Sequence, residues 1–93
     1  MQKIYSYYEE FGRMGELSGV FVSTDEALLA KKGQLAYFGE VLGKHSDIFT
    51  DEWFDHVECL TDDQDFIKKA IKYGLVRSGI NPLEYIDDFG DEE

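Results

Sequence analysis

The sequence predicts a single small α+β domain over residues 1–86, with an antiparallel sheet of about four to five strands and two helices packed on one face. Short segments in which apolar and polar residues alternate, and two segments that begin with helix-capping residues, favour this class. In addition, no repeat, linker or low-complexity block divides the 93 residues, of which 43% are hydrophobic. The expected order of elements is β-β-α-β-β-β-α, followed by an acidic flexible tail over residues 87–93.

The N-terminal half begins with two expected strands and a helix. Residues 3–9 alternate and are rich in tyrosine, and residues 20–22 are a run of Val and Phe, so both segments favour strands. Between the strands, glycines indicate a hairpin turn with a bulge, or a backbone that another segment approaches closely. These glycines are Gly12, Gly15 and Gly19. Ser23 and Glu26 then match the S-x-x-E capping box, which predicts a helix over residues 24–32 that a glycine ends.

Three further strands are expected in the middle of the chain. Residues 35–42 alternate most regularly and form the strongest strand candidate. Gly43 and Lys44 follow as a two-residue hairpin turn that leads to a short strand over residues 46–49. Residues 54–60 alternate again and predict the fifth strand.

A second helix and a short turn complete the expected domain. Thr61 and Gln64 repeat the capping pattern, with carboxylates in the first turn and lysines in the last. The helix ends at Gly74, and its apolar side chains share one face that should pack on the sheet. These side chains are Phe66, Ile67, Ala70 and Ile71. Asn81 and Pro82 have the residue types that begin one more short helical turn.

Negative charge is the strongest functional signal in the sequence. The chain has 20 acidic and 9 basic residues, and its formal net charge is -11. Eight carboxylates lie between His45 and Lys68 with no Lys or Arg among them, and we call this segment the acidic tract. Its members are Asp47, Asp51, Glu52, Asp55, Glu58, Asp62, Asp63 and Asp65. Such a surface repels nucleic acid and anionic membranes and attracts basic proteins, so we expect a basic-surfaced protein partner, such as a nuclease.

The first functional hypothesis is a non-enzymatic inhibitor that occludes the nucleic-acid-binding surface of its partner. Carboxylates fixed on strands and helix ends can imitate the closely spaced charges of a phosphate backbone. Trp53 lies within the tract, so we expect it to be an exposed anchor, with Tyr37 as a second candidate. This composition is similar to that of small acidic inhibitors of restriction or CRISPR nucleases, as in phage anti-defence proteins, and of nuclease-immunity proteins. The similarity is one of composition and covers no motif.

Two alternatives remain open. A small-ligand-binding or enzymatic domain would use the glycine-rich turn and its cation beside an aromatic sheet. The residues of that alternative site are Gly12, Arg13, Gly15, Tyr37 and His45. A homo-oligomer would instead assemble through sheet edges and exposed aromatic side chains.

Neither a catalytic triad nor a metal or cofactor site is expected. His45 and Ser46 are neighbours along a strand and therefore point to opposite faces, so a polar hairpin explains them better than nucleophilic catalysis. The carboxylates that begin the second helix match the helix dipole and not a calcium loop. Cys59 is the only cysteine and is expected to be a small buried hydrophobe. Because the chain also lacks a signal-peptide pattern and a long apolar run, we expect a cytoplasmic protein.

Overall fold

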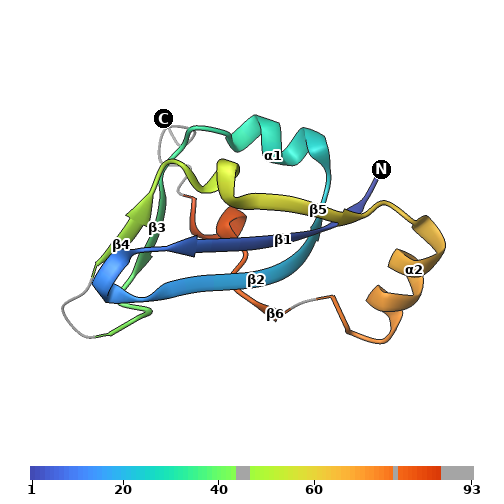
Figure 1. Ribbon diagram of the computed structural model, residues 1–93. Helices are drawn as coiled ribbons and strands as arrows, with labels where there is room; N and C mark the ends of the chain where they lie inside the picture. The colour runs from blue at the N-terminus through green and yellow to red at the C-terminus, as the bar shows by residue number, and fades with distance from the viewer. Residues whose placement is uncertain (44–46, 77, 87–93) are drawn as a thin grey trace.

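The computed structural model describes residues 1–43, 47–76 and 78–86, and within these ranges it contains six strands and two α-helices (Figure 1). The strands are β1 Lys3–Glu10, β2 Glu16–Ser23, β3 Ala36–Gly39, β4 Ile48–Thr50, β5 Val57–Thr61 and β6 Ser78–Gly79. The α-helices are α1 Asp25–Lys31 and α2 Gln64–Lys72, and short 3-10 turns are η1 Gly12–Met14, η2 Trp53–His56 and η3 Pro82–Tyr85. The α+β class is confirmed. One antiparallel sheet has the order β5-β1-β2-β6, and β3 and β4 form a separate two-stranded sheet.

The centre of the larger sheet is the β1–β2 hairpin. Its register runs from Lys3 opposite Ser23 to Glu10 opposite Glu16, and η1 forms the connection, as the glycines of this segment predicted. Gly19 has a different role, because a Cβ atom there would overlap the backbone of Ile80. The backbone of β2 can therefore lie directly against the chain around β6 only because this position has no side chain.

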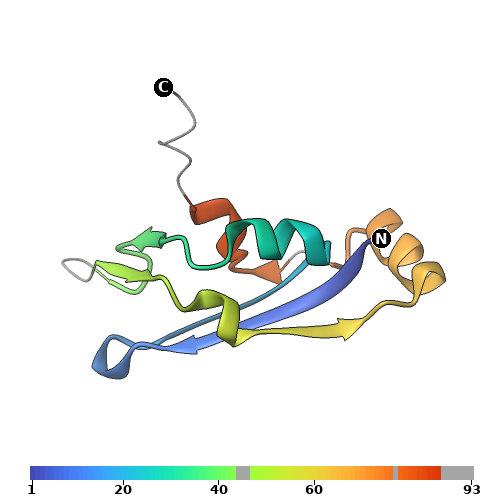
Figure 2. The ribbon, with the colours of Figure 1, turned by 90° about the horizontal axis from the view of Figure 1, so that it is seen from above.

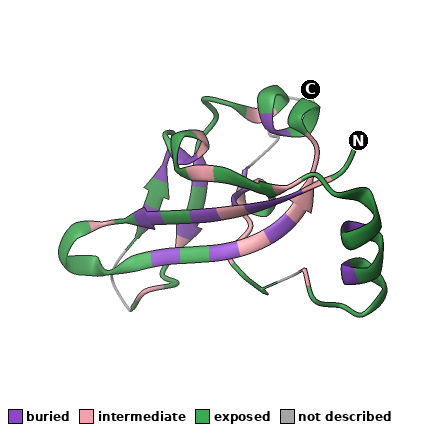
Figure 3. Ribbon diagram, turned by 45° about the vertical axis from the view of Figure 1, so that its right-hand side comes forward, coloured by how far each residue is buried: buried purple, intermediate pink, exposed green. Residues whose placement is uncertain are grey.

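The two faces of the hairpin build two separate apolar clusters. Alternation along β1 places Tyr5 in the larger cluster with Leu28 of α1, and places Ile4 in a smaller cluster with Ile67 of α2. Figure 2 shows α1 over the sheet and α2 beyond the N-terminal end of β1. Buried and exposed positions alternate along β2 (Figure 3). Instead of sharing one face, as the sequence led us to expect, the helices pack against side chains that point in opposite directions from β1 and β2.

The helix starts differ from expectation by one or two residues. Thr24, and not Ser23, caps α1, because its hydroxyl accepts a hydrogen bond from the amide of Ala27 at 3.0 Å. Asp63 caps α2 in the same way, whereas Thr61 is the last residue of β5. In both cases the residue chosen from the capping-box pattern is still part of the preceding strand, so the cap falls on a residue after that strand.

Strand boundaries also differ where long-range contacts decide them. The expected strand over residues 35–42 ends at Gly39, which has a positive φ of 70° and follows an irregularity in the pairing with β4. The expected strand over residues 54–60 begins instead with η2, so β5 starts only at Val57. Lys44, His45, Ser46 and the expected tail over residues 87–93 lie outside the described residues.

Candidate functional site

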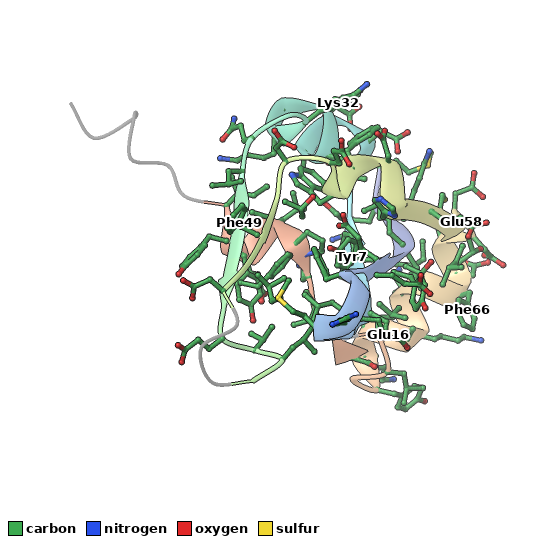
Figure 4. All side chains as sticks on the ribbon, turned by 60° about the vertical axis from the view of Figure 1, so that its left-hand side comes forward. Tyr7, Glu16, Lys32, Phe49, Glu58 and Phe66 are labelled. Atoms are coloured by element: carbon green, nitrogen blue, oxygen red, sulfur yellow. The ribbon has the colours of Figure 1, made fainter. Side chains whose placement is uncertain are left out.

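The acidic tract extends along the molecule from β4 through η2 and β5 to the start of α2 (Figure 1). All eight of its carboxylate residues are exposed. They do not form one patch. In Figure 4, Phe49 of β4 and Glu58 of β5 lie on opposite sides of the view. A partner with one flat basic surface could therefore contact only part of the tract at a time.

Two lysines from other parts of the chain interrupt the tract in space. Lys32 follows α1 and places its Nζ atom 4.8 Å from the centre of the Phe54 ring, next to Asp55 in the sequence. Lys3 of β1 forms an ion pair with Asp25 at 2.6 Å, and the negative charge of Asp62 also acts on it. The hydrogen bond with Asp25 raises the pKa of Lys3. Lys32 thus lies at η2, which joins the part of the tract around β4 to the part on β5 and the start of α2, whereas Lys3 lies near the second part.

Trp53 is not the exposed anchor that the sequence predicted. Its side chain is 0% exposed, and its indole Nε1 donates a hydrogen bond to the carbonyl oxygen of Gln34 at 2.9 Å. It lies in the larger core cluster and contacts Phe54 edge-on, with ring centres 5.9 Å apart. The charged neighbours of Trp53 are exposed because η2 turns the chain, and the same turn directs the indole inward. Trp53 therefore stabilises the fold and offers no surface to a partner.

The exposed aromatic surface within the tract is on the β3–β4 hairpin. Tyr37 and Phe49 are paired directly across the two strands, their rings stack with centres 6.4 Å apart, and they are 50% and 56% exposed. Asp47 and Asp51 lie two residues to either side of Phe49, just beyond the ends of β4, and both are exposed, so exposed and buried positions alternate from Asp47 to Asp51. We call this group, Tyr37, Asp47, Phe49 and Asp51, the hairpin patch.

Charge and aromatic surface are coupled within the hairpin patch. The negative charge of Asp47, together with a hydrogen bond to its carboxylate, raises the pKa of Tyr37. The ring of Tyr37 is therefore oriented by a neighbour as well as by its stacking on Phe49. Sequence reasoning had proposed Tyr37 as an anchor and had not singled out Phe49. The alternation of Asp47, Phe49 and Asp51 was the signal that could have identified it.

A buried carboxylate holds the hairpin against the larger sheet. Glu9 of β1 accepts hydrogen bonds from the hydroxyls of Tyr7 at 2.7 Å and Thr50 at 3.1 Å, and Thr50 belongs to β4. His56 places its Nε2 atom 3.6 Å from the same carboxylate. Burial raises the pKa of Tyr7, and its hydrogen bond to Glu9 acts in the same direction. Because these partners satisfy Glu9 locally, we interpret the network as the structural support of the hairpin patch.

The residues of the alternative ligand site are not brought around one cavity. Arg13 is exposed in the β1–β2 turn between Gly12 and Gly15, which have positive φ angles, and Tyr37 lies on the hairpin. Neither residue lines the groove of about 220 Å³ between α1 and β5, or the two hollows beside α2. His45 lies outside the described residues.

Cys59 differs from its expected burial. It is exposed and lines the groove between α1 and β5. Within the described ranges, no group of three or more His, Cys, Asp or Glu side chains is arranged to hold a metal ion. The helices of the described residues include none that combines the length and apolar character needed to cross a membrane.

Comparison with known proteins gives no relative: no family model matches the chain, and no curated protein or solved structure matches it significantly.

Proposed function

We propose that this chain is a non-enzymatic protein-binding module that engages a basic partner surface through the hairpin patch. The observation that supports this proposal is the stacked, half-exposed pair of Tyr37 and Phe49 between two exposed carboxylates. Aromatic rings at the centre of an interface concentrate binding energy, and a charged rim selects the partner and accelerates association. The hairpin patch combines both features on one short, two-stranded sheet.

The rigid support of the hairpin patch favours binding further. Hydrogen bonds from Thr50 to Glu9 and from Trp53 to Gln34 fix the hairpin on the core. A surface that is already ordered loses less conformational entropy when a partner covers it. The aromatic pair can therefore contribute to affinity without an accompanying change in the fold.

The specific form of the proposal is inhibition by occlusion. A nucleic-acid-binding protein has a basic surface whose natural ligand is a row of phosphates, and the carboxylates of the acidic tract offer a competing set of negative charges. In this proposal the hairpin patch provides the desolvated contact, and the rest of the tract provides long-range attraction that salt screens. A nuclease with a basic cleft fits this description of the partner.

The test uses immobilised wild-type protein and three immobilised variants, each exposed to nuclease-treated extract of the cells that produce the chain. We expect wild-type protein to retain a basic protein that elutes as salt is raised, and Phe49→Ala and the Asp47→Asn/Asp51→Asn pair to lose it. Leu75→Ala is the matched control, because Leu75 is an exposed apolar residue outside the hairpin patch.

The retained protein is then purified and its binding to labelled nucleic acid is measured as the chain is added. Displacement of nucleic acid by the wild-type chain, but not by Phe49→Ala, supports occlusion through the hairpin patch. Equal retention by wild-type protein and by both hairpin variants would contradict the proposal, and so would retention without competition for nucleic acid.

A further inference from the structure

The outer side of β5, at the edge of the larger sheet, is a second surface that could bind a partner, because its backbone groups face no neighbouring strand among the residues that the structure describes. β5 pairs on one side with β1, where Tyr5 is opposite Cys59 and Tyr7 is opposite Val57. In the part of the chain that the structure describes, no strand pairs with its other side. The residues in the middle of β5 are all exposed; they are Glu58, Cys59 and Leu60. Neither Lys nor Pro, which commonly protect sheet edges, occurs in this strand.

An apolar groove runs beside this edge. Leu28 and Leu29 of α1 form one wall, and Val57 and Cys59 of β5 form the other, with Phe54 between them. The polar part of the lining consists of Tyr5 and Asp25. A strand added to the edge of β5 would direct every second side chain towards α1, because its pleat would continue that of Val57 and Cys59. The groove is therefore in the correct place to receive alternate apolar side chains of an added strand.

The face of β5 that points away from the groove carries negative charge and would favour a positively charged ligand. Glu58 alternates with Val57 and Cys59 and so points away from the groove, while Asp55 and Asp62 flank β5 at its two ends. The cations close to the groove are already engaged: Lys3 is paired with Asp25, and Lys32 lies over Phe54. A Lys or Arg side chain on this face of an added strand would lie beside Glu58 and within the negative field of Asp55 and Asp62, and the exposed Leu60 shares the face with Glu58.

From these observations we propose that the edge of β5 binds an extended basic segment of another protein by β-strand addition. In that segment apolar residues enter the groove and alternate with Lys or Arg residues that face Glu58. A second copy of this chain fits the edge less well, because each copy carries a net charge of -11 and would bring its own Glu58 to the contact. This surface is distinct from the hairpin patch, since Phe49 and Glu58 lie on opposite sides in Figure 4.

The probe is a capped heptapeptide that alternates Lys and Val, added to ¹⁵N-labelled protein and followed by NMR. We expect concentration-dependent shifts of the amides of β5 and α1, and slower hydrogen exchange of the outward amides of β5. A peptide of the same composition with its lysines and valines in separate blocks, and a peptide that alternates Glu and Val, are the sequence and charge controls. Both should bind at least about 10-fold more weakly, because the block peptide loses the match between pleat and groove and the Glu peptide loses charge complementarity.

Two surface variants test the two faces of the edge separately. Glu58→Lys should weaken the alternating Lys/Val peptide about 10-fold by charge reversal, and Leu29→Ser should weaken it about 3-fold to 10-fold by removing apolar contact. Leu75→Ser is the control for Leu29→Ser, because both side chains are exposed but only Leu29 lines the groove. Each variant is first checked by its NMR spectrum for an unchanged fold.

Four results would overturn the inference. Equal binding of the alternating and block peptides would indicate attraction by charge alone, and so would shifts spread over the acidic tract with none at β5. Unchanged affinity in both Glu58→Lys and Leu29→Ser would exclude this edge as the binding surface. Concentration-dependent shifts at β5 without peptide would assign the edge to self-association. None of these results affects partner retention that depends on Phe49, so the two proposals fail separately.

Discussion

The replacement Trp53→Phe tests whether the only tryptophan of the chain serves the fold or the partner. The variant removes the part-buried hydrogen bond, 2.9 Å long, from the indole Nε1 to the carbonyl oxygen of Gln34, which is itself an exposed residue. Because water can reach this acceptor, loss of the hydrogen bond costs about 0.5–1.5 kcal/mol, the typical net contribution of one intramolecular hydrogen bond. The smaller ring also leaves space in the core. The cost of this space is below the loss of about 3–5 kcal/mol that follows truncation of a buried Trp to Ala. We expect the free energy of unfolding to fall by about 2–4 kcal/mol, a large part of the 5–15 kcal/mol typical of a domain.

The assay is urea unfolding followed by far-ultraviolet circular dichroism, because the variant lacks the tryptophan that fluorescence would require. The midpoint should fall while the slope with urea stays constant, since the surface exposed on unfolding changes little. Phe49→Ala is the informative comparison, because the ring of Phe49 is half exposed. We expect this variant to lose less than about 1 kcal/mol of the free energy of unfolding and to lose binding of the partner. Trp53→Phe should therefore mainly reduce stability, and Phe49→Ala should mainly reduce binding of the partner.

The opposite pattern would refute this reasoning. If Trp53→Phe unfolded within about 0.5 kcal/mol of the wild-type protein and also lost the partner, the indole would have to lie at the interface. The same conclusion would follow if the partner quenched the fluorescence of Trp53 by direct contact while Phe49→Ala bound normally.

Three further predictions concern other parts of the fold. Gly19→Ala should lower the free energy of unfolding by about 3 kcal/mol or more in the same urea assay. The new Cβ atom overlaps the backbone of Ile80, and neither β2 nor the chain after β6 can move freely. A loss below about 1 kcal/mol would contradict this close approach. Hydrogen bonds from Lys3 and Tyr5 lower the pKa of Asp25 below 3.8, so its contribution to stability is present above that value and is lost as pH falls through the lower pKa of the folded state. Urea unfolding between pH 6 and pH 2 should therefore show a smaller stability difference between wild type and Asp25→Asn at the acid end, and a difference independent of pH would exclude the interaction. Cys59 is exposed, so in the native protein it should react with an aromatic disulfide reagent at nearly the rate measured in urea; strong protection in the native state would restore the prediction of a buried thiol.

The sequence predicted those features that depend on neighbours along the chain. Alternation correctly separated Ile4 from Tyr5 and Tyr7, and these residues do enter different clusters. The glycine-rich connection was correctly assigned to a hairpin turn, and the start of each helix was located within two residues. Periodicity and capping are local properties, so they can be detected before any tertiary contact is known.

Features that depend on distant contacts could not be detected in this way. β6 has only two residues, Ser78 and Gly79, too few for a period, and it exists because Gly19 allows a close approach. The inward orientation of Trp53 depends on Gln34, which is 19 positions away in the chain. Cys59 has apolar neighbours but lies on an edge strand, and only the sheet order reveals that edge. The stacking of Tyr37 on Phe49 was not expected for the same reason, because the pairing of β3 with β4 brings the two rings together.

The strand order β5-β1-β2-β6 also has a consequence for the time course of folding. β1 and β2 are joined by residues 11–15 alone, so their hairpin closes with little loss of chain entropy, whereas β5 and β6 must return from much later in the chain. During synthesis from the N-terminus, we expect the hairpin to form while both of its long sides still lack partners. In a nascent chain that ends before residue 57, β1 would therefore still be an open edge, although it later lies inside the sheet. At this stage the chain would be most prone to pair with other unfinished copies.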